Sequence, residues 1–174
     1  MKKPQVAIVM GSDSDLEVMK DAAQALDELE VASEILILSA HRAPEETAKF
    51  AKGAKKRDIK VIIAGAGGAA ALPGSIAALT TLPVIGVPID SKLAGVDSLY
   101  SIVSMPPGVP VASVGINGAK NAGILAAEII GSSDPKIAKN LEKFKDKIRK
   151  DVLAKNTKLQ KLGLANYLKG KSSK

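Results

Sequence analysis

The sequence predicts an α/β fold in which a doubly wound, parallel five-stranded sheet forms the middle of three layers. Two observations predict it. Short continuous apolar runs, typical of strands buried on both faces, recur between residues 6 and 116. Between them lie segments whose apolar residues repeat every three or four positions, as in amphipathic helices. Because parallel strands need crossover connections, this alternation favours a sheet covered by helices on both faces.

The first half of the chain alternates strand and helix. The predicted order is a strand at 6–10, a helix opened by Ser14 or Asp15, a strand at 34–38, a helix from Pro44, and a strand at 60–64. Proline suits the first turn of a helix, because the N–H that it lacks would have no partner there. The two glutamates that follow Pro44 suit the positive end of the helix dipole.

The second half continues the alternation after a glycine cluster at 65–68. A short alanine-rich helix, which we expect to break near Leu72-Pro73-Gly74, is followed by a strand at 84–87 and a helical or mixed segment at 94–105. A fifth strand at 111–116 and a helix at 119–130 complete the pattern. Five strands suit a flavodoxin-like order, in which ligands bind beyond the carboxyl ends of the strands. That rule selects the loops at 11–15, 39–42, 65–74, 90–97 and 117–121.

The charge distribution divides the chain into residues 1–133 and residues 134–174. The first part carries 12 Lys and Arg against 14 Asp and Glu, and the second carries 13 against 4, so that the net charges are −2 and +9. Asp134-Pro135 is a helix-start signal. A single apolar stripe follows it, formed by Ile137, Leu141, Phe144, Ile148 and Val152. We therefore predict an α/β domain at 1–133, and at 134–174 a basic amphipathic helix and tail docked on the body or on a neighbouring subunit. The last residues, 169–174, are expected to fray.

Composition excludes several classes of protein. With 174 residues, 46% hydrophobic and 25% charged, the chain is the length of one ordinary globular domain. The absence of cysteine excludes a disulfide scaffold and a thiolate nucleophile, and it fits a reducing cytoplasm. The apolar run at 6–10 is too short for a membrane span. Tryptophan is absent, so an aromatic platform for nucleic acid is not expected, although the basic tail suits either a solvated helix face or an RNA contact.

The first candidate loop, Gly11 to Asp15, joins a strand to a helix through glycine and small hydroxyl residues. Such a loop suits phosphate binding, but it lacks the pattern of a P-loop. Two carboxylates would repel a phosphate, so Asp15 is better suited to accept hydrogen bonds from sugar hydroxyls. Asp13, Ser14 or Asp15 can equally cap the helix, and one residue can do both.

The second and third loops supply a proton carrier, a cation and an open backbone. His41 is the only histidine in the chain, and histidine is the side chain best suited to proton transfer near neutral pH. Arg42 beside it is a bidentate donor for phosphate or carboxylate. A lone histidine is also compatible with a packed or surface role. The glycine-rich run at 65–74 lets backbone approach a ligand closely, or serves tight helix–sheet packing. Neither a metal-ligand cluster nor a Ser–His–Asp triad is predicted.

These motifs together resemble class I 5-(carboxyamino)imidazole ribonucleotide mutases of purine biosynthesis. The resemblance rests on the run from Val6 to Asp15, on Ser39-Ala40-His41-Arg42, on residues 61–74 and 82–88, and on 96–103 ahead of Met105-Pro106. It covers about residues 5–131 in the same order. Only the basic tail lies outside it.

The resemblance implies a cytoplasmic isomerase that moves a carboxylate from an exocyclic nitrogen to ring carbon C4 without metal or organic cofactor. It also implies a flavodoxin-like fold and a homo-octamer with sites at subunit interfaces, with no role for nucleic acid or membrane. By position, His41 corresponds to the general acid and base of the family. The substrate-binding positions that it implies are Ser12, Ser14, Asp15, Ser39, Arg42, Gly67, Gly68 and Leu72.

The sequence departs from the family at three places. Many members carry histidine in the segment Gly-Gly-Ala-Ala-His-Leu-Pro-Gly, where this chain has Ala71, and the loops at 90–95 and 117–121 are shorter than usual. Two other functions stay open at this stage. One is the related class II carboxylase, which takes free carbon dioxide, although the 65–74 loop resembles class I. The other is a phosphosugar-binding or RNA-binding protein without catalysis.

Overall fold

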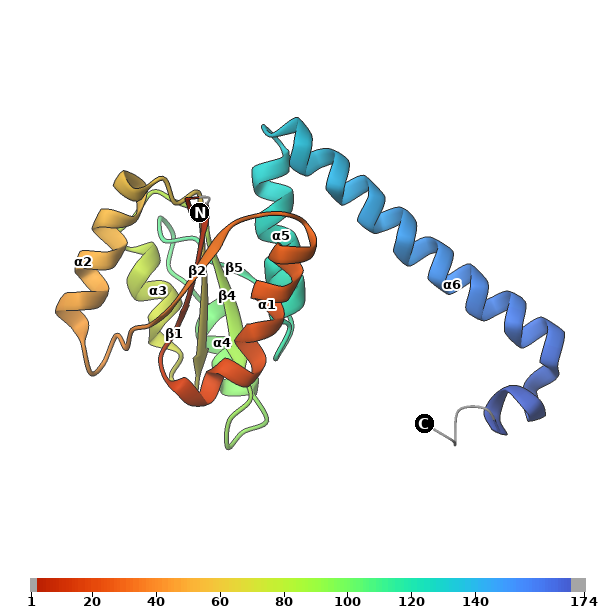
Figure 1. Ribbon diagram of the computed structural model, residues 1–174. Helices are drawn as coiled ribbons and strands as arrows, with labels where there is room; N and C mark the ends of the chain where they lie inside the picture. The colour runs from red at the N-terminus through yellow and green to blue at the C-terminus, as the bar shows by residue number, and fades with distance from the viewer. Residues whose placement is uncertain (1–2, 170–174) are drawn as a thin grey trace.

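A computed structural model describes residues 3–169 and contains a five-stranded sheet in the order β2-β1-β3-β4-β5 (Figure 1). The strands are β1 (Val6–Met10), β2 (Ser33–Ile37), β3 (Val61–Gly67), β4 (Val84–Ile89) and β5 (Ala112–Ser113). Each neighbouring pair is parallel. The strand order reverses between β1 and β3, as in flavodoxin-like sheets. The predicted fold class is therefore confirmed.

Helices cover both faces of the sheet. One face carries α1 (Leu16–Glu28) and α5 (Ala119–Gly131), and the other carries α2 (Pro44–Ala54), α3 (Ala71–Ala77) and α4 (Val96–Val103) (Figure 1). Two 3₁₀ turns, η1 (Asp13–Asp15) and η2 (Lys55–Arg57), precede α1 and follow α2. Alternating side chains of β1 enter opposite layers, because Ile8 belongs to the core under α1 and α5 whereas Ala7 and Val9 belong to the other core.

The helices α1 and α5 approach each other unusually closely. A Cβ atom built on Gly123 of α5 would lie 2.6 Å from the carbonyl oxygen of Ala22 in α1. No side chain fits at that distance, so glycine is required there for the two backbones to pack. The close pair forms the surface on which the last helix begins.

Three features differ most from the prediction. β3 continues through the glycine cluster to Gly67, and the predicted break near Leu72-Pro73-Gly74 is wrong, because α3 runs through these residues. Pro73 falls in the first turn of α3, where no N–H is needed. β5 pairs over only two residues instead of 111–116, at the edge of the sheet beside β4, in which Pro88 has no N–H to give to the ladder.

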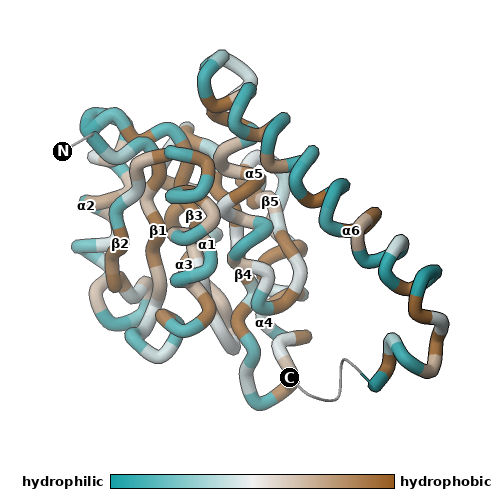
Figure 2. Tube along the Cα trace, turned by 45° about the vertical axis from the view of Figure 1, so that its right-hand side comes forward, coloured by the Kyte–Doolittle hydropathy of each residue, from teal (hydrophilic) through white to brown (hydrophobic). Residues whose placement is uncertain are grey.

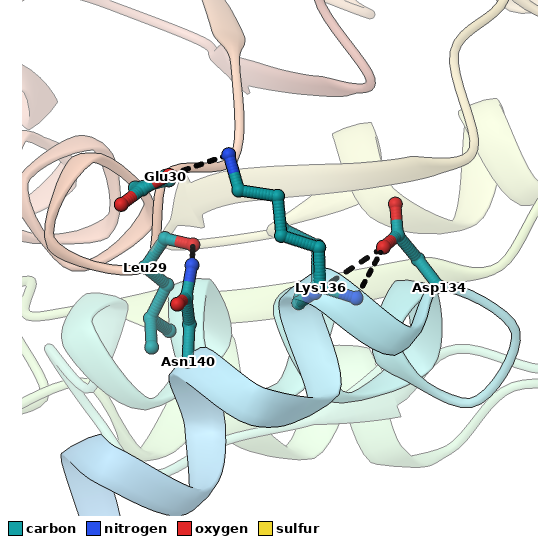
Figure 3. Close-up of polar contacts among 6 residues, drawn as sticks. Leu29, Glu30, Asp134, Lys136 and Asn140 are labelled. Carbon is teal, nitrogen blue, oxygen red and sulfur yellow. Dashed lines mark hydrogen bonds and ion pairs between the residues drawn. The ribbon is translucent and has the colours of Figure 1, made fainter.

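The last helix, α6 (Pro135–Lys169), begins where the sequence predicts it. The Oδ1 atom of Asp134 accepts hydrogen bonds from the backbone N–H groups of Lys136 at 2.9 Å and of Ile137 at 3.2 Å. The Nδ2 atom of Asn140 donates to the carbonyl oxygen of Leu29 at 3.1 Å (Figure 3). An ion pair between the Nζ atom of Lys136 and Oε2 of Glu30, at 2.6 Å, adds to this attachment.

The apolar stripe of α6 is docked over only half its length. Ile137, Leu141 and Phe144 are buried in the core shared with α1 and α5. Beyond them the helix leaves the body and points away from it (Figures 1 and 2). Ile148 and Val152, which the sequence places on the same stripe, are 47% and 58% exposed. The predicted fraying of the chain end concerns residues 169–174. Lys169 is the last residue of α6, and residues 170–174 lie outside the described residues.

No helix in the described part of the chain is both long enough and apolar enough to cross a membrane.

Candidate active site

A pocket of about 370 Å³ lies at the carboxyl ends of β1, β2 and β3. Three of the five loops selected from the sequence meet there, and the loops at 90–97 and 117–121 do not line it. The lining residues are Gly11, Ser12, Asp15, Ser39, Ala40, His41, Arg42, Ala66, Gly67, Ala70, Ala71 and Leu72. The pocket sits beside β1, next to the reversal in strand order, where doubly wound sheets bind their ligands.

The loop after β1 is capped by Ser12. Its backbone is extended, and its Oγ atom accepts a hydrogen bond from the N–H of Ser14 at 3.3 Å. Asp15 precedes α1 but forms no side-chain capping bond. The capping role that the sequence offered to Asp13, Ser14 or Asp15 therefore belongs to Ser12. The carboxylate of Asp15 is left to line the pocket.

Asp15 is the one residue lining the pocket whose pKa is clearly shifted. Partial burial raises the pKa of its carboxyl group above the ordinary value of 3.8. The hydroxyl of Ser14, which donates to Oδ1 at 3.3 Å, and the charge of Arg42 oppose that rise in pKa. A half-buried carboxylate with few donors has acceptor capacity to spare. Hydroxyl groups of a bound sugar would supply the missing hydrogen bonds.

Arg42 joins the loop after β2 to the loop after β1. Its Nη2 atom donates to the carbonyl oxygen of Gly11 at 2.7 Å, and its Nε atom donates to Oγ of Ser39 at 3.4 Å. The backbone N–H of Arg42 donates to the same Oγ at 3.2 Å. Among residues 3–169, no salt bridge engages the guanidinium group. The remaining N–H groups of the guanidinium are available to an anion in the pocket.

His41 occupies the turn that follows β2, at the mouth of the pocket. Its side chain is exposed, and within the described residues no hydrogen bond fixes its ring. The imidazole is therefore free to orient on a ligand. A free ring next to a cation and a carboxylate is suited to proton exchange with a bound molecule.

The opposite wall consists of small residues at the end of β3 and the start of α3. The backbone at Gly68 and at Ala70 is left-handed, with φ of 60° and 42°. In a residue other than glycine this conformation is strained by about 1 kcal/mol, and such strain collects at functional sites. The N–H of Ala70 donates to the carbonyl oxygen of Gly67 at 3.1 Å, which closes the turn.

Seven of the nine predicted site residues line the pocket, and Ser14 and Gly68 do not. Ser14 contributes indirectly through its hydrogen bond to Asp15, and Gly68 through the shape of its turn. The lining residues that the sequence did not indicate are small: Gly11, Ala40, Ala66, Ala70 and Ala71. They present backbone or a methyl group, and only their place in strand-end loops could have indicated them. Within residues 3–169, no group of three or more potential ligand side chains could hold a metal ion.

Comparison with known proteins assigns the family. The sequence pattern described as AIR carboxylase matches residues 5–151. The chain belongs to the AIR carboxylase family. All three loops that line the pocket lie inside the matched region.

Relatives within the AIR carboxylase family match the chain over nearly its full length. A protein of Thermotoga maritima named N5-carboxyaminoimidazole ribonucleotide mutase is 56% identical over 97% of this chain and 99% of its own length. A phosphoribosylaminoimidazole carboxylase of Schizosaccharomyces pombe is 55% identical over 96% of this chain but only 30% of its own. The crystal structure of PurE from Treponema denticola, 32% identical, superimposes with a TM-score of 0.83 over 90% of this chain and 98% of that one. The resemblance seen in the sequence is thus confirmed.

Proposed function

We propose that this chain is a mutase of purine biosynthesis that moves the carboxylate of 5-(carboxyamino)imidazole ribonucleotide from the exocyclic nitrogen to ring carbon C4. The observation that carries the proposal is the convergence of Ser12, Asp15, His41 and Arg42 on one pocket. The name of the full-length Thermotoga maritima relative supports it.

The ribose and phosphate of the substrate suit the polar side of the pocket. Arg42 and the Ser12 and Ser39 hydroxyls are donors for the phosphate oxygens. Asp15 accepts hydrogen bonds from the ribose hydroxyls, which compensate the partial burial of its carboxylate. The base then lies against the small wall formed by Gly67, Ala70 and Leu72, with its reacting atoms toward His41.

The reaction needs one group that first gives and later takes a proton. The substrate is a carbamate, and protonation of its nitrogen by His41 breaks the N–C bond and releases carbon dioxide. The electron-rich C4 atom attacks the carbon dioxide, forming the new C–C bond, and His41 removes the proton from C4. One proton is given and one is recovered, so a single histidine balances the cycle.

The released carbon dioxide must stay in the site between the two steps. The wall of Ala66, Ala70, Ala71 and Leu72 is apolar and offers no nucleophilic side chain to intercept it. A bound base that covers this wall would exclude water from the same space. Carbon dioxide is then recaptured before it is hydrated.

Transfer of a label tests the proposal. Substrate carrying carbon-13 in its carboxylate is converted in the presence of unlabelled bicarbonate, and the product is observed by carbon-13 NMR. We expect the label in the C4 carboxylate. Product that forms only from the uncarboxylated ribonucleotide and free carbon dioxide would instead establish a class II carboxylase. No product by either route would leave a non-catalytic phosphosugar-binding or RNA-binding protein.

The homo-octamer with sites at subunit interfaces, the cytoplasmic location and the absence of a nucleic-acid partner remain predictions. Apolar surface left uncovered in one copy of the chain supports the assembly. Light scattering of the purified protein measures its mass directly, and a monomer would contradict the octamer.

A further inference from the structure

The connection between β2 and α2 carries the proton carrier and the cation of the pocket, His41 and Arg42 (Figure 1). On the strand side it is fixed by the backbone N–H of Leu38, which donates to the carbonyl oxygen of Met10 at 2.9 Å. The ring of His41 has no hydrogen bond of its own to another described residue. The backbone of the turn therefore sets where His41 stands, and the start of α2 must hold that backbone in place.

The start of α2 lacks a capping side chain. Its N-cap residue is Ala43, whose methyl group cannot accept a hydrogen bond from the first turn. The first backbone N–H groups of any helix have no partner within the helix, so an end without a cap is prone to fray. Fraying here would release the residue that directly follows Arg42.

Thr47, one turn further along α2, supplies an attachment in place of the cap. Its Oγ1 atom donates to the carbonyl oxygen of Ala43 at 2.8 Å, and its backbone N–H donates to the same oxygen at 3.1 Å. The N–H of Ala43 in turn donates to the carbonyl oxygen of Ser39 at 2.8 Å. A continuous chain of hydrogen bonds thus leads from Thr47 through Ala43 to Ser39, whose Oγ atom accepts from Arg42.

The hydroxyl group of Thr47 lies where packing calls only for an apolar group. Thr47, Ala51 and Ala54 are the buried residues of α2, spaced by four and three along the face that meets the sheet. Thr47 is 2% exposed, and within residues 3–169 only Ser98 is a second buried polar residue. Burying a hydroxyl group is costly unless it is hydrogen-bonded. What this hydroxyl adds to the structure is the bond to Ala43.

We propose that Thr47 is a positioning residue, whose buried hydroxyl holds the Ala43 carbonyl and thereby keeps His41 and Arg42 in the geometry that the reaction needs. The inference rests on the proposed function, because it concerns the turn that transfers the proton and binds the phosphate. Thr47 does not line the pocket, so it acts through the turn and not on the substrate. One hydrogen bond between neutral groups shifts a local equilibrium by about 2- to 10-fold, which sets the size of the expected effect.

Two substitutions at this position separate the hydroxyl from the packing. Thr47→Val keeps the volume and the buried methyl group but removes the side-chain bond, whereas Thr47→Ser keeps the bond and removes the methyl group. In the valine variant the Ala43 carbonyl still accepts the backbone N–H of residue 47, so no buried acceptor loses its only partner. We therefore expect Thr47→Ser to unfold at the lower temperature of the two.

Activity should follow the hydroxyl and not the stability. At a temperature where every variant is folded, we expect kcat/KM of Thr47→Val to fall about 2- to 10-fold and that of Thr47→Ser to stay within about twofold of the wild type. Ser98→Ala is the matched control, because it removes the other buried hydroxyl, whose bond to the carbonyl oxygen of Ile89 at 2.7 Å involves no residue of the pocket. It should lower the unfolding temperature and leave kcat/KM unchanged.

Hydrogen–deuterium exchange measures the turn without any substrate. Mass spectrometry of a peptide covering residues 38–47 reports on the N–H groups of Arg42, Ala43 and residue 47. We expect this peptide to exchange about 2- to 10-fold faster in Thr47→Val than in the wild type and at the wild-type rate in Thr47→Ser, with peptides of α4 unchanged in both. Because this readout needs no activity, its failure and that of the mutase proposal are distinguishable.

Three results would overturn the proposal. Wild-type kcat/KM in Thr47→Val would mean that the hydroxyl does not hold the turn in its working geometry. A kcat/KM that tracks the unfolding temperature across all three variants would mean that Thr47 serves the fold alone. A lower kcat/KM in Thr47→Val with unchanged exchange over residues 38–47 would mean that the hydroxyl acts by another route than the turn.

Discussion

Substitution of Arg42 by lysine separates the positive charge in the pocket from the geometry that presents it. The guanidinium is held by the carbonyl oxygen of Gly11 at 2.7 Å and by Oγ of Ser39 at 3.4 Å. Lysine keeps the charge but cannot bridge these two loops and still present paired donors to a phosphate. Loss of one charge-assisted hydrogen bond costs about 1.5–3 kcal/mol, which is about a 10- to 150-fold weakening of binding.

The assay is steady-state kinetics with the carboxyamino ribonucleotide. We expect Arg42→Lys to raise KM by about that factor and to change kcat little, because the contact is made in both ground and transition states. Ser39→Ala is the matched variant. It removes a neutral hydroxyl group, whose hydrogen bonds are worth about 0.5–1.5 kcal/mol, and we expect a change in KM of about 2- to 10-fold. An Arg42→Lys enzyme whose KM stays within about threefold of the wild-type value would refute the assignment of Arg42 to the phosphate.

Four further substitutions probe the pocket and its support. Because burial raises the pKa of Asp15, the folded protein loses stability as pH rises from 3.8 through the raised value. Asp15→Asn should therefore be more stable than the wild type at neutral pH, by a margin that shrinks on acidification in urea titrations, while its KM rises; a margin independent of pH would contradict this. Gly123→Ala drives a methyl group against the oxygen of Ala22 and should cost about 1–3 kcal/mol by thermal unfolding. Gly53→Ala, whose Cβ would meet nothing within 4 Å, should instead gain about 0.5–1 kcal/mol, and equal shifts would count against the packing argument. Ala71→His puts a nucleophilic imidazole into the apolar pocket wall, and we expect a lower kcat; an unchanged or higher kcat would show that carbon dioxide is retained without a wholly apolar wall.

Much of the fold follows from periodicity. Continuous apolar runs identify β1 and β4 because both faces of these strands are covered, and the helix-period segments between them require parallel crossovers. The sequence was less informative where the backbone conformation determines the end of a strand. Glycines at 65 and 67 suggested a loop, yet β3 extends to Gly67. A Cβ atom on Gly65 would collide with the side chain of Met19 in α1, so close helix packing accounts for glycine there, whereas Gly67 is exposed at the end of the strand.

Some pocket residues could likewise be predicted from the sequence, and others could not. His41, Arg42 and Asp15 were identifiable because their chemistry is unusual for strand-end loops. Ala66 and Ala70 were not, since a methyl group has no chemical signature and the left-handed backbone of Ala70 depends on the turn that it closes. The partial docking of α6 could not be predicted either. Its stripe is continuous in sequence, and only the size of the body determines that burial ends near Phe144.

The most direct test of the central claim is the turnover of His41→Asn. Asparagine keeps a polar side chain of similar size but cannot carry a proton, and His41 is the only histidine in the chain. General acid–base catalysis contributes about 10²–10⁴-fold, so kcat should fall by that factor while the ribonucleotide still binds with nearly unchanged affinity in calorimetry. Retention of more than about a tenth of the wild-type kcat would show that another group moves the proton, and the mechanism proposed for this pocket would be wrong.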